Sequence, residues 1–265
     1  VIFIAVGTPK NVENDGADLS QVFSCAKVIA KNIKNNTLVI LKSTVPVGTC
    51  DKVEEIIKLV NPSIDFDVVS NPEFLREGSA IFDFENPDRV ILGTKNKDSI
   101  LTLNSIYKKQ VDNDFPIIFT KRRSSELIKY ASNSMLAMRI IFINEIADLC
   151  EKVGADVEDI ALGIGLDKRI GPHFLNAGPG FGGSCFPKDA RALVKSGKNY
   201  SAPQGLLKAV IDGNEKRKKN LSKKIISIAK DKKNIGILGV TYKANTDDIR
   251  EAPSLSIIPD LIDKG

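Results

Sequence analysis

One cysteine stands where a helix is expected to begin. Cys185 follows the glycine-rich string GPGFGGS and precedes Pro187, Lys188 and Asp189. Proline favours the first helical position, so the cysteine would lie beside a helix N-terminus, where the helix dipole and the Lys188 ammonium both favour the thiolate. The pattern predicts a nucleophilic cysteine, and the alternative is an inert, buried thiol.

Two polar residues, Lys129 and Asn133, are four positions apart in a long helix-like stretch, so they would share one helical face. An ammonium group near an amide suits the stabilisation of an oxyanion that develops during a reaction. The alternative is a polar stripe that faces solvent.

Acids and hydroxyls follow several predicted strands. Glu73 and Glu77 lie in SNPEFLREG after one strand end, and Thr8 and Thr44 lie at two others. Open α/β sheets bind ligands at the carboxyl ends of their strands, so these groups are candidates to orient a ligand or a water molecule. As an alternative, the two glutamates are first-turn acids that complement a helix dipole.

Two further strings concern phosphate binding. GPGFGG matches G-x-G-x-x-G at Gly178, Gly180 and Gly183, but no predicted strand precedes it and position 203, about 20 residues on, is proline. We therefore reject it as a dinucleotide fingerprint. The string TYKANTDDIRE follows the last predicted strand, and its charged side chains suit a phosphate group. They are Lys243, Asp247, Asp248 and Arg250.

The elements that position these residues change along the chain. Short apolar runs alternate with helix-like segments in the first third, which predicts a layered α/β sheet. The expected strands are Val1–Val6, Thr37–Leu41, Phe66–Val69, Arg89–Leu92 and Pro116–Phe119, and the expected helices are Leu19–Lys34, Asp51–Val60 and Ile100–Lys109.

A helical pattern of about 30 residues then runs from Ser124, a candidate cap, to Gly154, and would span about 45 Å. Such a helix usually links domains or builds a dimer interface. More helices are expected at Val157–Leu162, Lys188–Lys195 and Ala202–Lys230, and IGILGV after Asn234 predicts a buried strand before a helix near Ser254.

Composition excludes several classes of protein. No apolar run among the 265 residues approaches the ~20 needed to cross a bilayer. The net charge of +5 is concentrated between Glu215 and Asn234, where no aromatic residues are interleaved, so a solvated helical face is favoured over a nucleic-acid site. Four separated cysteines and one histidine predict no metal site and a cytoplasmic protein with reduced thiols.

Six strings in order identify the sequence as resembling the UDP-glucose/GDP-mannose dehydrogenase family of nucleotide-sugar 6-dehydrogenases. They are VGTP, KSTVPVG, SNPEFLREGSA, ELIKYASN, RIGPHFLNAGPGFGGSCFPKD and TYKANTDDIREAPS. The resemblance covers essentially the whole chain. It implies oxidation of the sugar C6 alcohol to a carboxylate by two NAD⁺, with UDP-glucose as the expected substrate and GDP-mannose or a UDP-N-acetyl sugar as alternatives.

The resemblance also implies roles for residues. Cys185 would capture the aldehyde as a thiohemiacetal and carry the thioester, Lys129 and Asn133 would stabilise the oxyanion, and Glu73 would be the acid/base group. Asp189 and Thr44 would order the base and water. The implied NAD contacts are Thr8, Thr44, Glu77, Lys188 and Arg250. The implied substrate contacts are Glu73, Phe74, Leu75, Lys129, Asn133, Asn176, Gly178, Gly180, Phe181, Gly182, Tyr242 and Lys243, with Arg169 reaching the partner subunit's substrate.

The resemblance predicts three regions. Residues 1–119 would form a Rossmann-like NAD-binding domain, residues 120–216 a central helical domain whose long helix builds a homodimer, and residues 217–265 the start of a second Rossmann-like domain that binds the UDP-sugar. Family members begin with a strand and a G-x-G-x-x-G turn upstream of the position of Val1, so the sequence is expected to be truncated at both ends. A non-catalytic remnant is the alternative to an enzyme.

Overall fold

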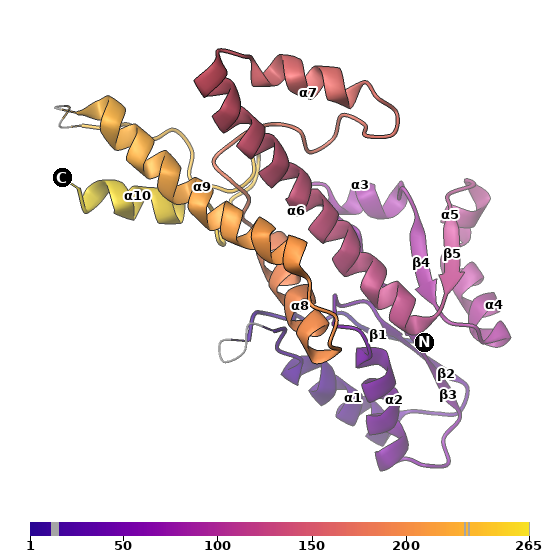
Figure 1. Ribbon diagram of the computed structural model, residues 1–265. Helices are drawn as coiled ribbons and strands as arrows, with labels where there is room; N and C mark the ends of the chain where they lie inside the picture. The colour runs from indigo at the N-terminus through magenta and orange to yellow at the C-terminus, as the bar shows by residue number, and fades with distance from the viewer. Residues whose placement is uncertain (12–15, 231, 233, 265) are drawn as a thin grey trace. The chain divides into compact units, whose positions relative to one another are not determined.

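The computed structural model describes residues 1–11, 16–230, 232 and 234–264 (Figure 1). The chain divides into two units, Val1–Ala131 and Ser132–Gly265. The division falls within a single helix, α6 (Arg122–Val153), whose 32 residues confirm the long helical pattern. Ser124 lies inside α6 and does not cap it, whereas Gly154 adopts the left-handed conformation directly after its last residue.

The first unit is built on a five-stranded sheet with the strands in chain order. The first three strands are parallel, the fourth pairs antiparallel with the third through Ser70 and Gly93, and the fifth is parallel to the fourth. Each of the five apolar runs predicted in the first third of the chain overlaps one of these strands. They are β1 (Ile2–Ile4), β2 (Thr37–Leu41), β3 (Phe66–Ser70), β4 (Val90–Gly93) and β5 (Ile117–Thr120).

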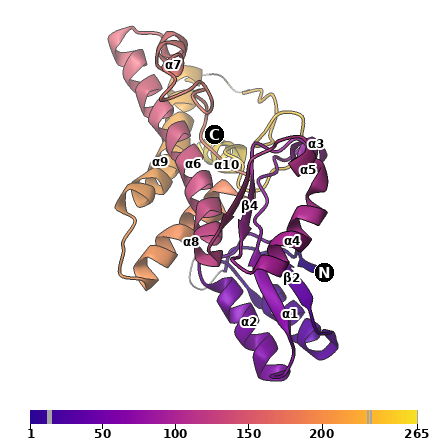
Figure 2. The same ribbon diagram turned by 90° about the vertical axis from the view of Figure 1, so that its right-hand side faces the viewer.

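Helices cover both faces of this sheet because successive residues of a buried strand point to opposite faces. Val39 and Leu41 of β2 pack with α1 (Ser20–Asn32) and α2 (Thr49–Val60), which lie side by side (Figure 2). Leu38 and Ile40 pack in a second core, which Leu103 and Tyr107 complete. The remaining helices of this unit are α3 (Ala80–Glu85), which was not predicted, α4 (Lys97–Ile106) and α5 (Lys108–Asp112).

Gly93 ends β4 at a place where no side chain fits. A Cβ atom there would lie 2.8 Å from the Ser125 Cβ and 2.9 Å from the Arg122 Cα. The Gly93→Ala substitution is therefore expected to lower the free energy of unfolding by about 1–3 kcal/mol, measured by urea denaturation of the protein that the complete gene encodes. Gly163→Ala is the control: a Cβ at this helical glycine meets nothing within 4 Å, so stability should hold or rise. Equal denaturation midpoints for Gly93→Ala and the parent would contradict the prediction.

The second unit is helical. Ala137 and Ile141 of α6 pack with Phe181, with Ala190 of α8 and with two residues of α9 to form one core. The helices that follow α6 are α7 (Val157–Gly165), α8 (Phe186–Asn199), α9 (Gly205–Ala229) and α10 (Ser254–Ile262). In the described residues, none of these or the preceding helices has both the length and the apolar character of a membrane span.

The prediction of a strand at Ile235–Val240 was wrong. This segment forms no strand within the described part of the chain, and Leu238 is fully exposed. An extended apolar segment becomes a strand only where a neighbour bonds its N–H and C=O groups, and the described residues supply no such neighbour here. The helix expected near Ser254 is present as α10.

Candidate active site

Glu73 and Lys129 form an ion pair in the first unit. The Lys129 Nζ atom lies 3.1 Å from the Glu73 Oε1 atom, and the Lys129 side chain is only 5% exposed. The second carboxylate oxygen of Glu73 accepts a hydrogen bond of 2.6 Å from the Leu75 N–H. Because α3 begins only at Ala80, neither Glu73 nor Glu77 is a first-turn acid, and because Lys129 is buried, it does not belong to a solvent-facing stripe.

Phe74 links this pair to a second cation. The Lys129 Nζ lies 5.1 Å from the centre of the Phe74 ring, and the Arg89 guanidinium carbon lies 3.8 Å from it. Cations over an aromatic face are stabilised by the ring quadrupole. The segment Glu73–Leu75 is thus fixed by Lys129 and Arg89, and Arg89 was not among the predicted residues.

Lys42 is a further residue that the sequence did not indicate. It follows β2, and its Nζ donates to the Asn71 Oδ1 at 3.2 Å and to the Tyr107 hydroxyl at 3.3 Å. Burial lowers the pKa of Lys42 to about 8; the Glu73 carboxylate opposes this shift and the Lys129 charge adds to it. The only available signal was a lysine placed directly after a buried strand.

Thr8 and Thr44 join the segments that follow β1 and β2. The Thr8 hydroxyl donates a hydrogen bond of 2.8 Å to the Thr44 carbonyl oxygen. Glu77 lies farther along the chain, in the turn before α3. The carboxyl ends of the first three strands therefore supply Thr8, Thr44 and Glu73 from neighbouring segments.

The second unit holds the cysteine. Cys185 is exposed and occupies the N-cap position of α8, so it is not the inert buried thiol of the alternative. Pro187 is the second residue of this helix and not the first, because α8 begins at Phe186. The Cys185 Sγ lies 3.6 Å from the Ser184 hydroxyl oxygen.

A buried carboxylate lies in the first turn of the same helix. Asp189 is 1% exposed, and it accepts a hydrogen bond of 2.6 Å from the Asn133 side-chain amide of α6. Its other oxygen pairs with the Lys188 ammonium. Asn133 is also buried, so the solvent-facing alternative is wrong for it as well. An acid, an amide, an ammonium and a helix-start thiol therefore share one end of α8.

The glycine-rich loop before Cys185 is held by two asparagines. The Asn214 side chain accepts from the Phe181 N–H at 2.8 Å and donates to the Phe181 carbonyl at 3.0 Å, and Asn144 accepts from the Gly178 N–H at 2.8 Å. Gly180 has a φ of +120°, and a Cβ there would lie 2.6 Å from the Asn214 Oδ1. A loop and not a strand precedes these glycines, in agreement with the rejection of the fingerprint. No sequence signal indicated either asparagine.

The charged turn near the C-terminus packs against this loop. The Gly183 N–H donates to the Arg250 carbonyl at 2.7 Å, and a Cβ on Gly183 would lie 2.7 Å from the Tyr242 ring. The Arg250 guanidinium pairs with Asp248 at 2.7 Å. Tyr242, Lys243 and Arg250 therefore lie on a turn that contacts the cysteine loop.

Two predicted residues lie outside these clusters. Arg169 and Asn176 are exposed in the loop between α7 and α8, and Arg169 pairs with Asp167 at 2.6 Å. Their predicted substrate contacts remain predictions.

Comparisons with known proteins agree with this arrangement. Residues 1–111 match the NAD binding domain of the UDP-glucose/GDP-mannose dehydrogenase family, residues 123–216 its central domain, and residues 236–265 its UDP binding domain. A UDP-glucose 6-dehydrogenase of Rhizobium meliloti is 52% identical over 100% of this chain and 62% of its own length. The chain thus spans less than two thirds of that relative.

Two solved structures are also similar. A UDP-glucose dehydrogenase from Pyrobaculum islandicum has 39% identity and a TM-score of 0.93, and the match covers 99% of this chain and 61% of that one. A GDP-mannose dehydrogenase from Pseudomonas aeruginosa has 33% identity and a TM-score of 0.59, with 99% and 61% covered.

The class of protein is defined by the polar residues at the strand ends of the first unit and by the helices of the second unit. The chain consists of a Rossmann-like dinucleotide-binding domain, a helical domain and the start of a third domain. NAD is the cofactor of the first domain. More particularly, the chain belongs to the UDP-glucose/GDP-mannose dehydrogenase family.

Proposed function

We propose that the protein encoded by the complete gene oxidises UDP-glucose to UDP-glucuronate with two NAD⁺. The observation that carries this proposal is the exposed Cys185 at the start of α8, in the same turn as the buried Asp189, which accepts a hydrogen bond from Asn133 of α6. A thiol, an acid and an amide together suit an oxidation that passes through a covalent intermediate. The similarity to a UDP-glucose 6-dehydrogenase at 52% identity supports this substrate.

Cys185 has the central chemical role in this proposal. When bound, NAD⁺ would supply the oxidising power: the C6 alcohol would lose a hydride to it and its hydroxyl proton to water, which leaves an aldehyde. The Cys185 sulfur then adds to the aldehyde carbon, and the carbonyl oxygen takes a proton to give a thiohemiacetal. Transfer of the remaining C6 hydrogen as a hydride to the second NAD⁺, with loss of the hydroxyl proton to water, would give a thioester. Water adds to the thioester carbon and the C–S bond breaks. This releases the carboxylate product and restores the free Cys185 thiol.

The other residues of the two clusters divide the remaining tasks. Lys129 and Asn133 stabilise the negative oxygen at C6, since each supplies a buried N–H donor. Glu73 is the acid/base group of the thioester stage, and Asp189 and Thr44 order the base and the water. Substrate contacts are proposed for Phe74, Leu75, Arg169, Asn176, Gly178, Gly180, Phe181, Gly182, Tyr242 and Lys243.

The residues of the first unit fit the cofactor. The Thr8 hydroxyl bridges the segments after β1 and β2 at the carboxyl edge of parallel strands, which is where open α/β sheets bind dinucleotides. Thr8, Thr44 and Glu77 would hold NAD from this edge. Lys188 and Arg250 are proposed as further cofactor contacts. Each cation already pairs with a carboxylate, Asp189 or Asp248, and would bind the cofactor beside this partner.

The experiment that tests the proposal compares three substrates. The purified protein from the complete gene is incubated with NAD⁺ and with UDP-glucose, GDP-mannose or a UDP-N-acetyl sugar, and NADH is followed by absorbance. We expect two NADH for each UDP-glucuronate and the highest kcat/KM with UDP-glucose. A higher kcat/KM with GDP-mannose would overturn the assignment of UDP-glucose as the substrate, and a lack of NADH with every sugar would favour a non-catalytic remnant.

The expected location of the protein is the cytoplasm, because its four cysteines are free thiols.

We also propose that α6 builds a homodimer. Met135, Phe142 and Leu149 are exposed at seven-residue intervals, so they form one apolar stripe along the helix. Charge in this stripe should separate the subunits, and the Phe142→Glu variant is expected to halve the mass measured by analytical ultracentrifugation. Ile228→Glu, at an exposed apolar residue of α9, is the control and should keep the parent mass. A Phe142→Glu variant with the parent mass would contradict the α6 interface.

A further inference from the structure

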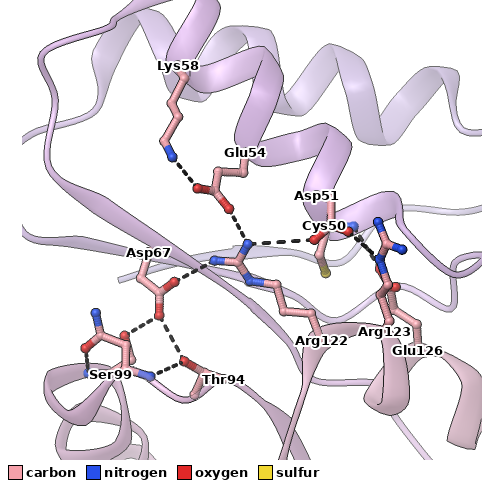
Figure 3. A network of polar contacts seen from close by, with 11 residues as sticks. Cys50, Asp51, Glu54, Lys58, Asp67, Thr94, Ser99, Arg122, Arg123 and Glu126 are labelled. Carbon is pink, nitrogen blue, oxygen red and sulfur yellow. Dashed lines mark hydrogen bonds and ion pairs between the residues drawn. The ribbon is translucent and has the colours of Figure 1, made fainter.

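A carboxylate from α6 caps the beginning of α2. Glu126 is 2% exposed, and its two oxygens accept hydrogen bonds of 2.6 Å from the Gly48 N–H and 2.8 Å from the Cys50 N–H. Figure 3 shows Glu126 beside Cys50, with Arg122 and Arg123 of the same helix reaching Asp51. The contact joins residues that are 78 positions apart in the chain.

The start of α2 needs this external partner. The N-cap residue is Gly48, which has no side chain and adopts a left-handed backbone with a φ of +90°. The first N–H groups of a helix have no partner within the helix, and the dipole favours an anion beside them. Burial raises the pKa of Glu126, and the bonds from Cys50 and Gly48 oppose this shift. Glu126 thus fills the place of a missing cap.

Two arginines strengthen the same junction. Arg122 pairs with Glu54 of α2 and, at 2.8 Å, with Asp67 of β3, and Arg123 pairs with Asp51 of α2 at 2.7 Å (Figure 3). The first two turns of α6 therefore hold α2 through three side chains. Of these, Glu126 alone is fully buried and bonds the backbone of the turn.

The segment that Glu126 holds carries Thr44. Residues 44–48 run from the end of β2 into α2; the Thr8 hydroxyl binds the Thr44 carbonyl at one end, and Glu126 binds the Gly48 N–H at the other. Val45 between them is buried in the core. The segment therefore has a bond at both ends and an apolar anchor in the middle.

Glu126 and Lys129 are also linked. They are three residues apart on α6, which places them on the same side of the helix. Lys129 binds Glu73 after β3, while Glu126 binds Gly48 and Cys50 after β2. One short stretch of helix thus fixes two of the segments that carry proposed functional groups.

We propose that Glu126 is a positioning residue, which sets the place of Thr44 relative to the Glu73–Lys129 pair by bonding the backbone of the turn that follows Thr44. This inference rests on the proposed function for its kinetic consequence. Its structural part, the restraint of residues 44–50, is independent of the substrate.

The test is the Glu126→Gln variant of the protein from the complete gene. Glutamine keeps the shape but turns an N–H donor toward one of the two backbone donors, so the turn loses one of its bonds. We expect amide hydrogen exchange in residues 44–50 to be about tenfold faster, and that over β4 to be unchanged. Because Thr44 is misplaced, kcat should fall about 10- to 100-fold and the KM for NAD⁺ should rise, while the KM for UDP-glucose holds.

Two further variants keep the test sharp. Glu55→Gln, the same change at an exposed glutamate of α2, is the matched control, and its kinetics and exchange should match the parent. Glu126→Asp, which is one methylene shorter, should shift in the same direction as Glu126→Gln and serves if the latter does not fold. Parent-like exchange in residues 44–50, or an equal rise in both KM values, would overturn the proposal. A parent protein that reduces no NAD⁺ would refute the proposed function, and the exchange data would still decide the role of Glu126.

Discussion

Replacing Cys185 by serine in the protein from the complete gene is expected to abolish the release of UDP-glucuronate. The hydroxyl of serine is not ionised near neutral pH and is a far weaker nucleophile than a thiolate, so no covalent intermediate would form. We expect the rate of UDP-glucuronate formation to fall at least about 10³-fold, as is typical when a nucleophile is removed. Chromatography of the nucleotide sugars measures the product directly.

The position of Cys185 makes this substitution a clean test. The side chain is exposed and caps no backbone group of α8, so serine should leave the fold unchanged. Cys25→Ser, the same change at a half-buried cysteine of α1, is the matched control and should retain the parent rate. Undiminished UDP-glucuronate formation by Cys185→Ser would rule out the nucleophile role.

Removal of the Lys129 ammonium is expected to have the second largest effect. Lys129→Met keeps much of the length and apolar volume of the side chain but removes the donor that we assign to the C6 oxyanion. Loss of one such donor from a buried site typically costs about 10²–10³-fold in kcat. We expect a fall of that size, with a smaller change in the KM for UDP-glucose, in steady-state assays of NADH formation.

A control for charge is available in the same unit. Lys108 of α5 pairs with Asp112 at 2.7 Å, and both side chains are exposed, so Lys108→Met removes an equivalent charge away from the strand ends. Its kcat should equal that of the parent, because an exposed ion pair contributes little to the free energy of folding and this one lies away from the strand ends. A Lys129→Met variant that folds, as judged by circular dichroism, and keeps the parent kcat would refute the oxyanion role.

The sheet and the long helix could be predicted because their signals are local. Apolar runs such as Thr37–Leu41 are short and buried on both faces, and the α6 pattern extends over 32 residues without a break. The run Ile235–Val240 has the same local character, yet it forms no strand in the described part of the chain. A strand depends on a partner that the run itself does not encode.

The candidate site shows the same limit of local information. Cys185, Lys129 and Glu73 could be predicted from the sequence because their residue types and the strings around them form a chemical pattern. Lys42 and Glu126 carry none, since their roles come from contacts with residues far along the chain, such as Tyr107 for the first and Gly48 for the second. Only the fold brings these groups together.

The three-way pairing of Arg122 has an evolutionary consequence. Its guanidinium binds Glu54 on one helix and Asp67 on a strand, so the three positions form one ion-pair group whose free energies are not additive. Loss of the arginine alone would leave Asp67 with only the hydroxyl donors of Thr94 and Ser99, and Glu54 with only Lys58 as its partner. In lineages that diverge from this chain, positions 54, 67 and 122 should therefore change together, and their co-variation would mark the junction in an alignment even where no structure is known.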